Sequence, residues 1–296
     1  MKKAVGLGAC VFDTLIECNE YPKEDTKYKS DGVFISGGGP VGNALVVMKK
    51  LGVETVCLGL FANDDAGKYL IDDFKKYGVD VSGAVVLDGK TSFKSYILLS
   101  EKSKTRTCVF DRGSVPDDAS LLDYSVLKGA DIVHLDGNYL NCALQTAKKA
   151  KEMGIKVSLD AGGLYENIES LLPYVDILIP SKEFALGITG KKNIPDAMYV
   201  LFEKYNPEIL VVTDGDNGGY YMDGGEVFHY ESIRVDAVDT NGAGDTFHGA
   251  FLVAYLDGKS VKDCCKYAST VAGYKCSHKG VRDYPLSKEI IDSIIH

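Results

Sequence analysis

The sequence lacks several features that mark particular protein classes. It has no tryptophan, only 8 prolines, and no Cys-x-x-C pair among its 8 cysteines. Zinc sites are commonly built from such pairs, so we expect none. No lysine- or arginine-rich tract occurs and the formal net charge is -9, so the chain lacks the positive surface that neutralises nucleic-acid phosphates. A nucleic-acid partner is therefore not expected.

Long hydrophobic runs are also missing, and no stretch approaches the length of a membrane-spanning helix. The N-terminus, Met1-Lys2-Lys3 and a short apolar stretch interrupted by Gly6 and Gly8, does not follow the pattern of a signal peptide. Without a signal, the scattered cysteines are expected to be reduced thiols. We interpret the protein as cytoplasmic, with no membrane partner.

Apolar content is sufficient for one large core, since 45% of the 296 residues are hydrophobic. Short β-branched or leucine-rich runs alternate with helical patterns, as in parallel sheets with crossover helices. The predicted strands are 53–60, 131–136, 155–160, 175–180 and 208–214. The predicted helices lie near 40–51, 65–77, 141–153, 194–205, 242–257 and 261–277. This alternation predicts a doubly wound α/β fold with a mainly parallel sheet.

Three segments break this pattern, because 28–35, 91–100 and 105–110 alternate polar and apolar residues as half-exposed antiparallel strands do. They predict a small β-sheet lid, formed by segments at about 13–36 and 90–112, beside the main sheet. No linker or repeat divides the chain, so residues 1–296 are expected to form a single domain. The apolar face of such a lid favours a homodimer that pairs through it.

The most informative segment is 239–251, Asp-Thr-Asn-Gly-Ala-Gly-Asp-Thr-Phe-His-Gly-Ala-Phe. Small residues allow the backbone to approach a ligand, and the helix that follows directs its free N–H groups and positive dipole end at an anion. Asp245 in the same turn is placed to accept a proton from a hydroxyl. The alternative is a tight turn in which Asp245 caps the helix.

A second glycine-rich segment, 37–44, reads Gly-Gly-Gly-Pro-Val-Gly-Asn-Ala and leads toward Leu51-Gly52. By itself it indicates only a good helix start. Together, the two segments resemble the signatures of the PfkB carbohydrate-kinase family, and weaker matches extend the resemblance over the whole chain. The resemblance implies a ribokinase-like kinase that uses ATP and Mg²⁺ and binds a small sugar.

The resemblance also assigns roles to individual residues. It implies Asp245 as the catalytic base, beside an anion hole formed by Gly242, Ala243 and Gly244. The acceptor-binding residues that it implies are Asp13, Gly38, Gly39 and Asn43. An aspartate suits a polyol, because one carboxylate accepts hydrogen bonds from two adjacent hydroxyls. Asp13 has the alternative of a solvated residue in a loop.

On the nucleotide side, residues 211–218 resemble the family's strand and turn around ATP. The implied nucleotide-binding residues are Thr213, Gly215, Gly218 and Lys275. Lys275 has the alternative of a surface position on a helix. The resemblance further implies a monovalent cation, such as K⁺, at Asp239.

The metal site departs from the family pattern, because Ser181 stands where many members have Asn, and Glu183 comes one residue early. We expect Glu183 to organise Mg²⁺ through water, with the alternative that it is a capping-box residue at the third position of a helix. Asp160, at the end of another strand, is the second candidate carboxylate. His248 is expected to be a packed histidine rather than a catalytic one.

The resulting hypothesis is ATP-dependent phosphorylation of a hydroxyl on a hexose or pentose. Two alternatives remain open. A nucleoside kinase of the same superfamily would need an aromatic platform, which Phe34, Phe93 and Tyr96 offer. A non-catalytic sugar- or nucleotide-binding relative would be expected to lack the aspartate or the glycine turn. Arg106 and Arg112 are interpreted as surface residues of the lid, although an anionic acceptor would give them another role.

Overall fold

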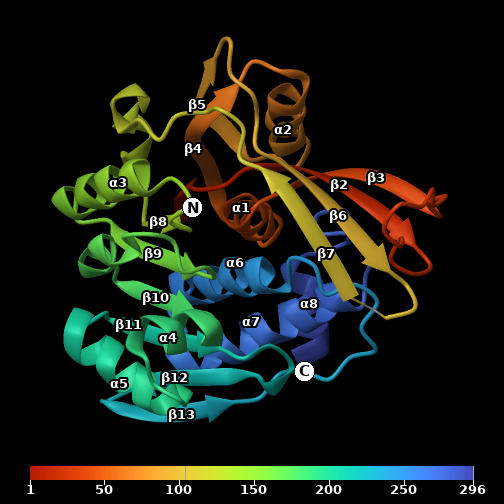
Figure 1. Ribbon diagram of the computed structural model, residues 1–296. Helices are drawn as coiled ribbons and strands as arrows, with labels where there is room; N and C mark the ends of the chain where they lie inside the picture. The colour runs from red at the N-terminus through yellow and green to blue at the C-terminus, as the bar shows by residue number, and fades with distance from the viewer. Residues whose placement is uncertain (104, 296) are drawn as a thin grey trace.

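A central nine-stranded sheet organises the chain in the computed structural model, which describes residues 1–103 and 105–295 (Figure 1). Its strand order is β13-β12-β11-β10-β9-β8-β1-β4-β5, and all neighbours are parallel except for the pairs that involve β12. The strands are β1 (Lys3–Leu7), β4 (Glu54–Ala62), β5 (Asp80–Leu87), β8 (Ile132–Leu135), β9 (Lys156–Ala161), β10 (Ile177–Pro180), β11 (Ile209–Thr213), β12 (Gly219–Asp223) and β13 (Glu226–Tyr230).

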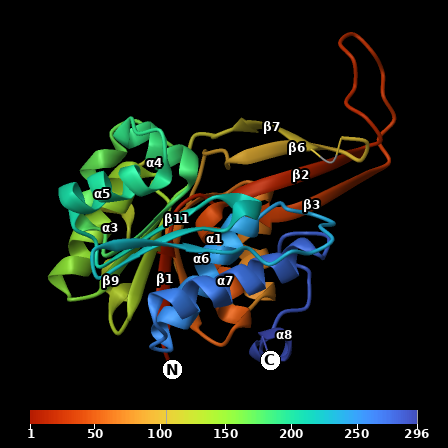
Figure 2. The ribbon, with the colours of Figure 1, turned by 90° about the horizontal axis from the view of Figure 1, so that it is seen from below.

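Helices cover both faces of this sheet and bury two separate apolar clusters against it (Figure 2). One face carries α1 (Pro40–Lys50), α2 (Asp65–Lys76), α6 (Ala243–Leu256), α7 (Val261–Cys276) and α8 (Lys288–Ile295). The other carries α3 (Leu140–Glu152), α4 (Lys182–Thr189) and α5 (Ile194–Tyr205). Short 3₁₀ turns lie at Ala119–Leu121, Tyr124–Leu127, Ile168–Ser170, Leu172–Tyr174 and Gly215–Asn217. The predicted doubly wound α/β fold is confirmed.

A separate four-stranded sheet, which we call the lid, projects beside the helices (Figure 1). It contains β2 (Val11–Cys18), β3 (Gly32–Gly38), β6 (Lys94–Ser100) and β7 (Thr105–Asp111), in the order β3-β2-β6-β7. The predicted strand at 28–35 begins only at Gly32, and that at 91–100 begins at Lys94. The alternation of polar and apolar residues therefore located these strands but not their starts.

The two faces of the lid differ in composition. Directly paired residues project from the same face, so Asp13 shares its face with Ser95 and Phe110. The opposite face carries Ile35, Tyr96 and Val109, which lie in one row across the sheet through Thr14 and are about half exposed or more. One face is thus associated with Asp13, and the other is an exposed apolar surface.

Side-chain caps fix the starts of several helices. Asp64 accepts a hydrogen bond from the Gly67 N–H at the start of α2, and Ser181 accepts one from the Phe184 N–H at the start of α4. Because Ser181 is the N-cap, Glu183 occupies the second helical position, so the capping-box alternative at the third position is wrong. Within the described residues, no helix is both long and apolar enough to span a membrane.

Candidate active site

A cavity of about 250 Å³ opens where the parallel strands end. Its walls include Asp136 after β8, Asp160 on β9, Ser181 after β10 and Thr213 on β11. Asp245, in the first turn of α6, completes the lining from the other side. Open α/β sheets bind their ligands at this carboxyl edge, and the strand order reverses direction at β1. The topology therefore brings residues from five separate segments to one site.

The turn that begins α6 has the geometry of an anion-binding element. Gly242 is the N-cap with a φ of 74°, a left-handed conformation that favours glycine, and a Cβ there would lie 2.5 Å from Val281. Gly244 is exposed, while Asp245 is partly buried. The first N–H groups of a helix have no intrahelical partner, so this turn offers donors and the positive end of the helix dipole.

Asp245 is joined to the other glycine-rich segment by one short hydrogen bond. Asn43, on α1, donates from Nδ2 to Asp245 Oδ2 over 2.6 Å. Burial raises the pKa of Asp245, whereas the hydrogen bond from Asn43 and the charges of Arg106 and Arg282 lower it. The Asp245 carboxylate is thus partly dehydrated, hydrogen-bonded to Asn43 and stabilised by the charges of Arg106 and Arg282.

Asp13, on lid strand β2, does not line the cavity itself but lies near enough to Asp245 to interact with its charge. Its Oδ1 accepts a hydrogen bond of 2.5 Å from Ser95, and burial raises its pKa to about 6. A Cβ on Gly38 would collide with the Asp13 carboxylate, and one on Gly39 would collide with the carbonyl of Ala9. Gly38 is therefore required for the 37–44 turn to approach Asp13, and Gly39 for the same turn to approach the main chain at Ala9.

A group of buried ionisable side chains forms the floor of the cavity. Burial and the nearby charges of Asp245 and Asp136 raise the pKa of Asp160 well above its usual range. Asp136 accepts backbone N–H bonds from Ala9 and Asn138. His248 is buried, as predicted, and its Nε2 lies 3.3 Å from Asp160 Oδ1, a contact that the sequence analysis missed. Burial also lowers the pKa of His248 well below its usual range.

The nucleotide-side residues are only partly brought together. Thr213 lines the cavity, and Gly215 and Gly218 follow in the turn after β11 with φ values of 58° and 79°. Glu183 is exposed on α4 and does not line the cavity. In the part of the chain that the structure describes, no group of three or more His, Cys, Asp or Glu side chains is arranged to hold a metal ion.

Lys275 does not occupy the surface position that was its alternative. It is fully buried, and its Nζ donates to the main-chain oxygen of Asp239 over 2.7 Å. The carboxylate oxygens of Asp239 accept N–H bonds from Asn241 and Gly280. Lys275 and Asp239 therefore hold together the chain that enters the 242–245 turn.

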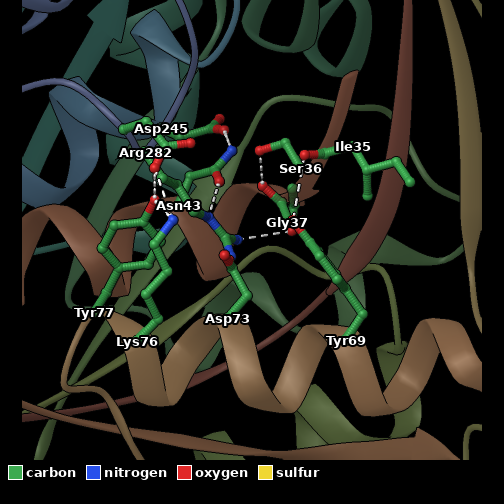
Figure 3. A network of polar contacts seen from close by, with 12 residues as sticks. Ile35, Ser36, Gly37, Asn43, Tyr69, Asp73, Lys76, Tyr77, Asp245 and Arg282 are labelled. Atoms are coloured by element: carbon green, nitrogen blue, oxygen red, sulfur yellow. Dashed lines mark hydrogen bonds and ion pairs between the residues drawn. The ribbon is translucent and has the colours of Figure 1, made fainter. Parts of the chain in front are cut away.

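Two arginines contribute more than the sequence indicated. Arg106, interpreted as a surface residue of the lid, donates to the side-chain oxygen of Asn241, next to Gly242. Arg282, which the sequence analysis did not identify, is 1% exposed and contacts Asn43 (Figure 3). The sequence around Arg282, Val281-Arg282-Asp283, gives no signal that distinguishes it from an ordinary surface arginine.

Comparisons with known proteins identify the family of the chain. Residues 1–289 match the pfkB family of carbohydrate kinases. The chain is 23% identical to an ATP-dependent ribose-1-phosphate kinase of Halopiger xanaduensis, with 98% of this chain and 97% of that protein covered. It is 24% identical to the ketohexokinase of Mus musculus, with 94% and 97% covered.

Solved structures show the same fold. Arabidopsis thaliana ribokinase, complexed with ribose and ATP, superposes with a TM-score of 0.84 at 24% identity over 99% of this chain and 98% of that one. An E. coli protein complexed with ATP and Mg²⁺ gives 0.86 at 21% identity over 100% and 99%. The protein is thus a phosphotransferase with an alcohol group as acceptor. It belongs to the pfkB carbohydrate kinase family and is a kinase of a sugar or nucleoside.

Proposed function

We propose that the protein phosphorylates a hydroxyl group of a small, unphosphorylated sugar, a hexose or pentose, with ATP as the phosphoryl donor. The observation that carries this proposal is the Asp245 carboxylate, which lines the cavity in the first turn of α6 and is hydrogen-bonded to Asn43. A base beside a helix N-terminus can accept a proton while the neighbouring amides stabilise an anion. Relatives named ribokinase and ketohexokinase support a sugar as the acceptor.

Each residue near Asp245 has a defined part in this reaction. Asp13 and Asn43 bind acceptor hydroxyls, and Gly38 and Gly39 leave the space that this part of the site needs. Asp245 accepts the proton of the attacking hydroxyl as that oxygen bonds to the γ-phosphorus and the bond to the β-phosphate oxygen breaks. The amides of Gly242 and Gly244 stabilise the charge on the transferred group, whereas the predicted third donor, the Ala243 N–H, already donates to the main-chain oxygen of Thr240 over 3.2 Å. Positioning and electrostatics supply most of the catalysis in phosphoryl transfer.

The cavity also suits Mg²⁺, because Asp160 is a carboxyl whose pKa is raised first by burial and then by the neighbouring carboxylates of Asp245 and Asp136. A divalent cation relieves such repulsion, and Mg²⁺ commonly reaches one or two carboxylates while keeping several waters. Asp160 is the side chain that would hold it, with exposed Glu183 acting through water from α4. When bound with ATP, Mg²⁺ neutralises phosphate charge. Thr213, Gly215 and Gly218 would contact the phosphates and ribose of ATP.

The resemblance implies K⁺ at Asp239, but the residues there fit a fixed ammonium group better. Both oxygens of the Asp239 carboxylate already accept backbone N–H bonds, and Lys275 Nζ lies 3.7 Å from Oδ1. We therefore propose that Lys275 supplies the positive charge behind the 242–245 turn and that turnover does not require K⁺.

A nucleoside acceptor is the second candidate, favoured by one specific feature of the lid. The rings of Phe93 and Phe110 lie 5.7 Å apart, and Phe110 pairs with Ser95, so it faces the same side as Asp13. Aromatic rings in this place suit a nucleobase. Tyr96 faces away from Asp13 and therefore does not contribute to such a platform.

The exposed face of the lid supports a homodimer. Ile35, Tyr96 and Val109 are 52%, 48% and 63% exposed in one row, and contiguous apolar surface of this kind is typical of protein contacts. We propose that two copies pair through these rows. The opposite face, with Asp13 and Arg106, would close over the acceptor and exclude water, which is a competing acceptor.

A coupled assay of ADP release tests the proposal. The purified protein is given Mg·ATP with fructose, ribose, other hexoses, acid sugars, sugar phosphates or nucleosides. We expect release that depends on an unphosphorylated sugar and disappears in Asp245→Asn. Release with adenosine or inosine alone would replace the sugar with a nucleoside, and binding of ATP and sugar without turnover would indicate a non-catalytic relative.

A further inference from the structure

Arg282 lies in the connection between α7 and α8, and its guanidinium contacts Asn43, the hydrogen-bond partner of Asp245 (Figure 3). The side chain is 1% exposed. Nε donates to Asn43 Oδ1 over 2.8 Å, one terminal nitrogen donates to Asp73 Oδ2 over 2.6 Å, and the other donates to the main-chain oxygen of Gly38 over 3.1 Å. One cation thus contacts α1, α2 and the end of lid strand β3.

The surrounding chain leaves space for this guanidinium. A Cβ on Gly42 would lie 2.7 Å from one terminal nitrogen of Arg282, and a Cβ on Gly37 would collide with the other. The ring of Phe74 lies 5.2 Å from the guanidinium carbon. Two glycines of the 37–44 segment are therefore needed to accommodate a residue far away in the sequence, in addition to those that face Asp13.

The hydrogen bond to Asn43 fixes which way its amide points. A guanidinium has only donors, so the atom of Asn43 that faces Nε must be the acceptor oxygen Oδ1. The amide nitrogen then has to face Asp245, where it lies 2.6 Å from Oδ2. The reversed amide would set N–H against the guanidinium and oxygen against the carboxylate, which loses both hydrogen bonds.

We propose that Arg282 is a positioning residue, which orients the Asn43 amide and through it the carboxylate of Asp245. The inference rests on the proposed role of Asp245 as the base. Asp73 alone would neutralise the buried charge, so the bond to Asn43 is the contact that links Arg282 to the reaction. The positive charge of Arg282 also lowers the pKa of Asp245 and so favours the ionised form of this carboxylate.

Arg282→Met tests this role, and Lys50→Met is its matched control. Lys50 is also a partly buried cation that anchors the same segment, with Nζ donating to the main-chain oxygens of Arg282 and Tyr284. It has no contact with Asn43 or Asp245 among these bonds. Loss of anchoring affects both variants, whereas loss of amide orientation affects only Arg282→Met.

The first readout is the pH profile of kcat/KM with the acceptor found by the ADP-release assay. The other charged groups around Asp245 are Asp13, Asp160, Arg106 and Lys275, and both variants keep them. For Arg282→Met we expect kcat/KM to fall about 10- to 100-fold at neutral pH and the acidic limb to move up by about one pH unit. In Lys50→Met the acidic limb of the pH profile of kcat/KM should stay where it is in the wild type.

An Asn43→Ala background separates positioning from general damage. If Arg282 acts through Asn43, adding Arg282→Met to Asn43→Ala should reduce kcat/KM by less than about threefold, because the shared interaction is already lost. Full additivity of the two effects would overturn the inference. An acidic limb that stays in place in Arg282→Met, or that moves equally in Lys50→Met, would also overturn it.

A ¹³C-carboxylate NMR titration needs no acceptor and keeps this inference separate from the proposed function. The Asp245 resonance is identified by its loss in Asp245→Asn, and its pKa should rise in Arg282→Met but not in Lys50→Met. If that rise is smaller when Arg282→Met is added to Asn43→Ala, the part carried by Asn43 is separated from the direct effect of the charge, and the positioning role would stand even if no acceptor were turned over. An unchanged pKa beside an active kinase would overturn the positioning role alone. If Arg282→Met does not fold, Arg282→Met with Asp73→Leu removes both buried charges and gives the same titration test.

Discussion

Asn43 Nδ2 lies 2.6 Å from Asp245 Oδ2, although 202 residues separate them in the chain. The bond joins the two glycine-rich segments through α1 and α6, which pack directly against each other. Neither segment alone distinguishes a helix start from a catalytic turn. The hydrogen bond between Asn43 and Asp245 fixes the direction of the Asp245 carboxylate, which lines the cavity.

Replacement of Asp245 by Asn should remove the base while preserving the shape of the turn. We expect kcat to fall by about 10²- to 10⁴-fold, which is the usual contribution of general base catalysis. ATP binding should change little, because the amides of the 242–245 turn remain. The measurement is steady-state ADP release together with ATP affinity by calorimetry. Near-normal turnover in this variant would remove Asp245 from the reaction.

Asp13 predicts a specific pH dependence of stability. Its folded pKa of about 6 lies above the ordinary value of 3.8, so the folded state holds a proton that the unfolded state releases between these values. Stability from this group is complete below about pH 4 and is lost as pH rises through about 6. Asp13→Asn should therefore be more stable than the wild type at pH 7 to 8, by on the order of 2 kcal/mol, with the difference shrinking toward pH 4.

Urea unfolding of both proteins at several pH values measures this difference. The same variant should bind the sugar more weakly at pH 7.5, because a neutral amide replaces a carboxylate that accepts two hydroxyls. A stability difference that does not change with pH would show that Asp13 has an ordinary pKa in the folded protein.

Lys275→Met should create a need for a free cation. The wild type is expected to turn over equally in potassium and in tetramethylammonium buffers, since the buried ammonium already lies beside Asp239. In Lys275→Met the turnover rate should fall about tenfold or more, because a fixed positive charge near a transferred phosphoryl group commonly stabilises the transition state by at least this factor. Added K⁺ or NH₄⁺ should restore part of the rate. K⁺ should also raise the melting temperature of the variant but not of the wild type. Strong K⁺ activation of the wild type would instead favour an ion site at Asp239.

Local patterns in the sequence predicted much of this arrangement. Most of the buried strands, most helices and the 242–245 turn follow from hydrophobic periodicity and glycine placement, which depend on neighbours in the chain. The buried strand β1 was not among the predicted strands. Asp13 and Asn43 could be named because the resemblance to the PfkB family implies acceptor-binding roles for them. The antiparallel strands β12 and β13 extend the edge of the sheet, and β13 and β5 were not predicted because their exposed residues interrupt the apolar pattern.

Contacts that form only in three dimensions were not accessible in this way. Arg282, Lys275 and the pair of His248 with Asp160 are buried charges or rings whose partners come from other elements. A lysine on a helix is usually exposed, so the residue type alone suggested a surface position for Lys275, whereas the structure buries it. The direction of each lid residue also required the register, which assigns Tyr96 and Asp13 to opposite faces.

The apolar row on the lid leads to a final prediction about assembly. Tyr96→Lys with Val109→Lys places two charges among side chains that are 48% and 63% exposed in the single chain, so the folded monomer should tolerate them. If two copies pair through this row, the charges become buried without partners and the dimer should weaken by about 100-fold or more. Light scattering after gel filtration measures the mass of each variant. Lys75→Glu changes the charge at an exposed site on α2 outside the lid, and it controls for the effect of altered charge alone. It should leave the mass of the assembly unchanged. A wild type that is monomeric at all concentrations tested would contradict pairing through the lid.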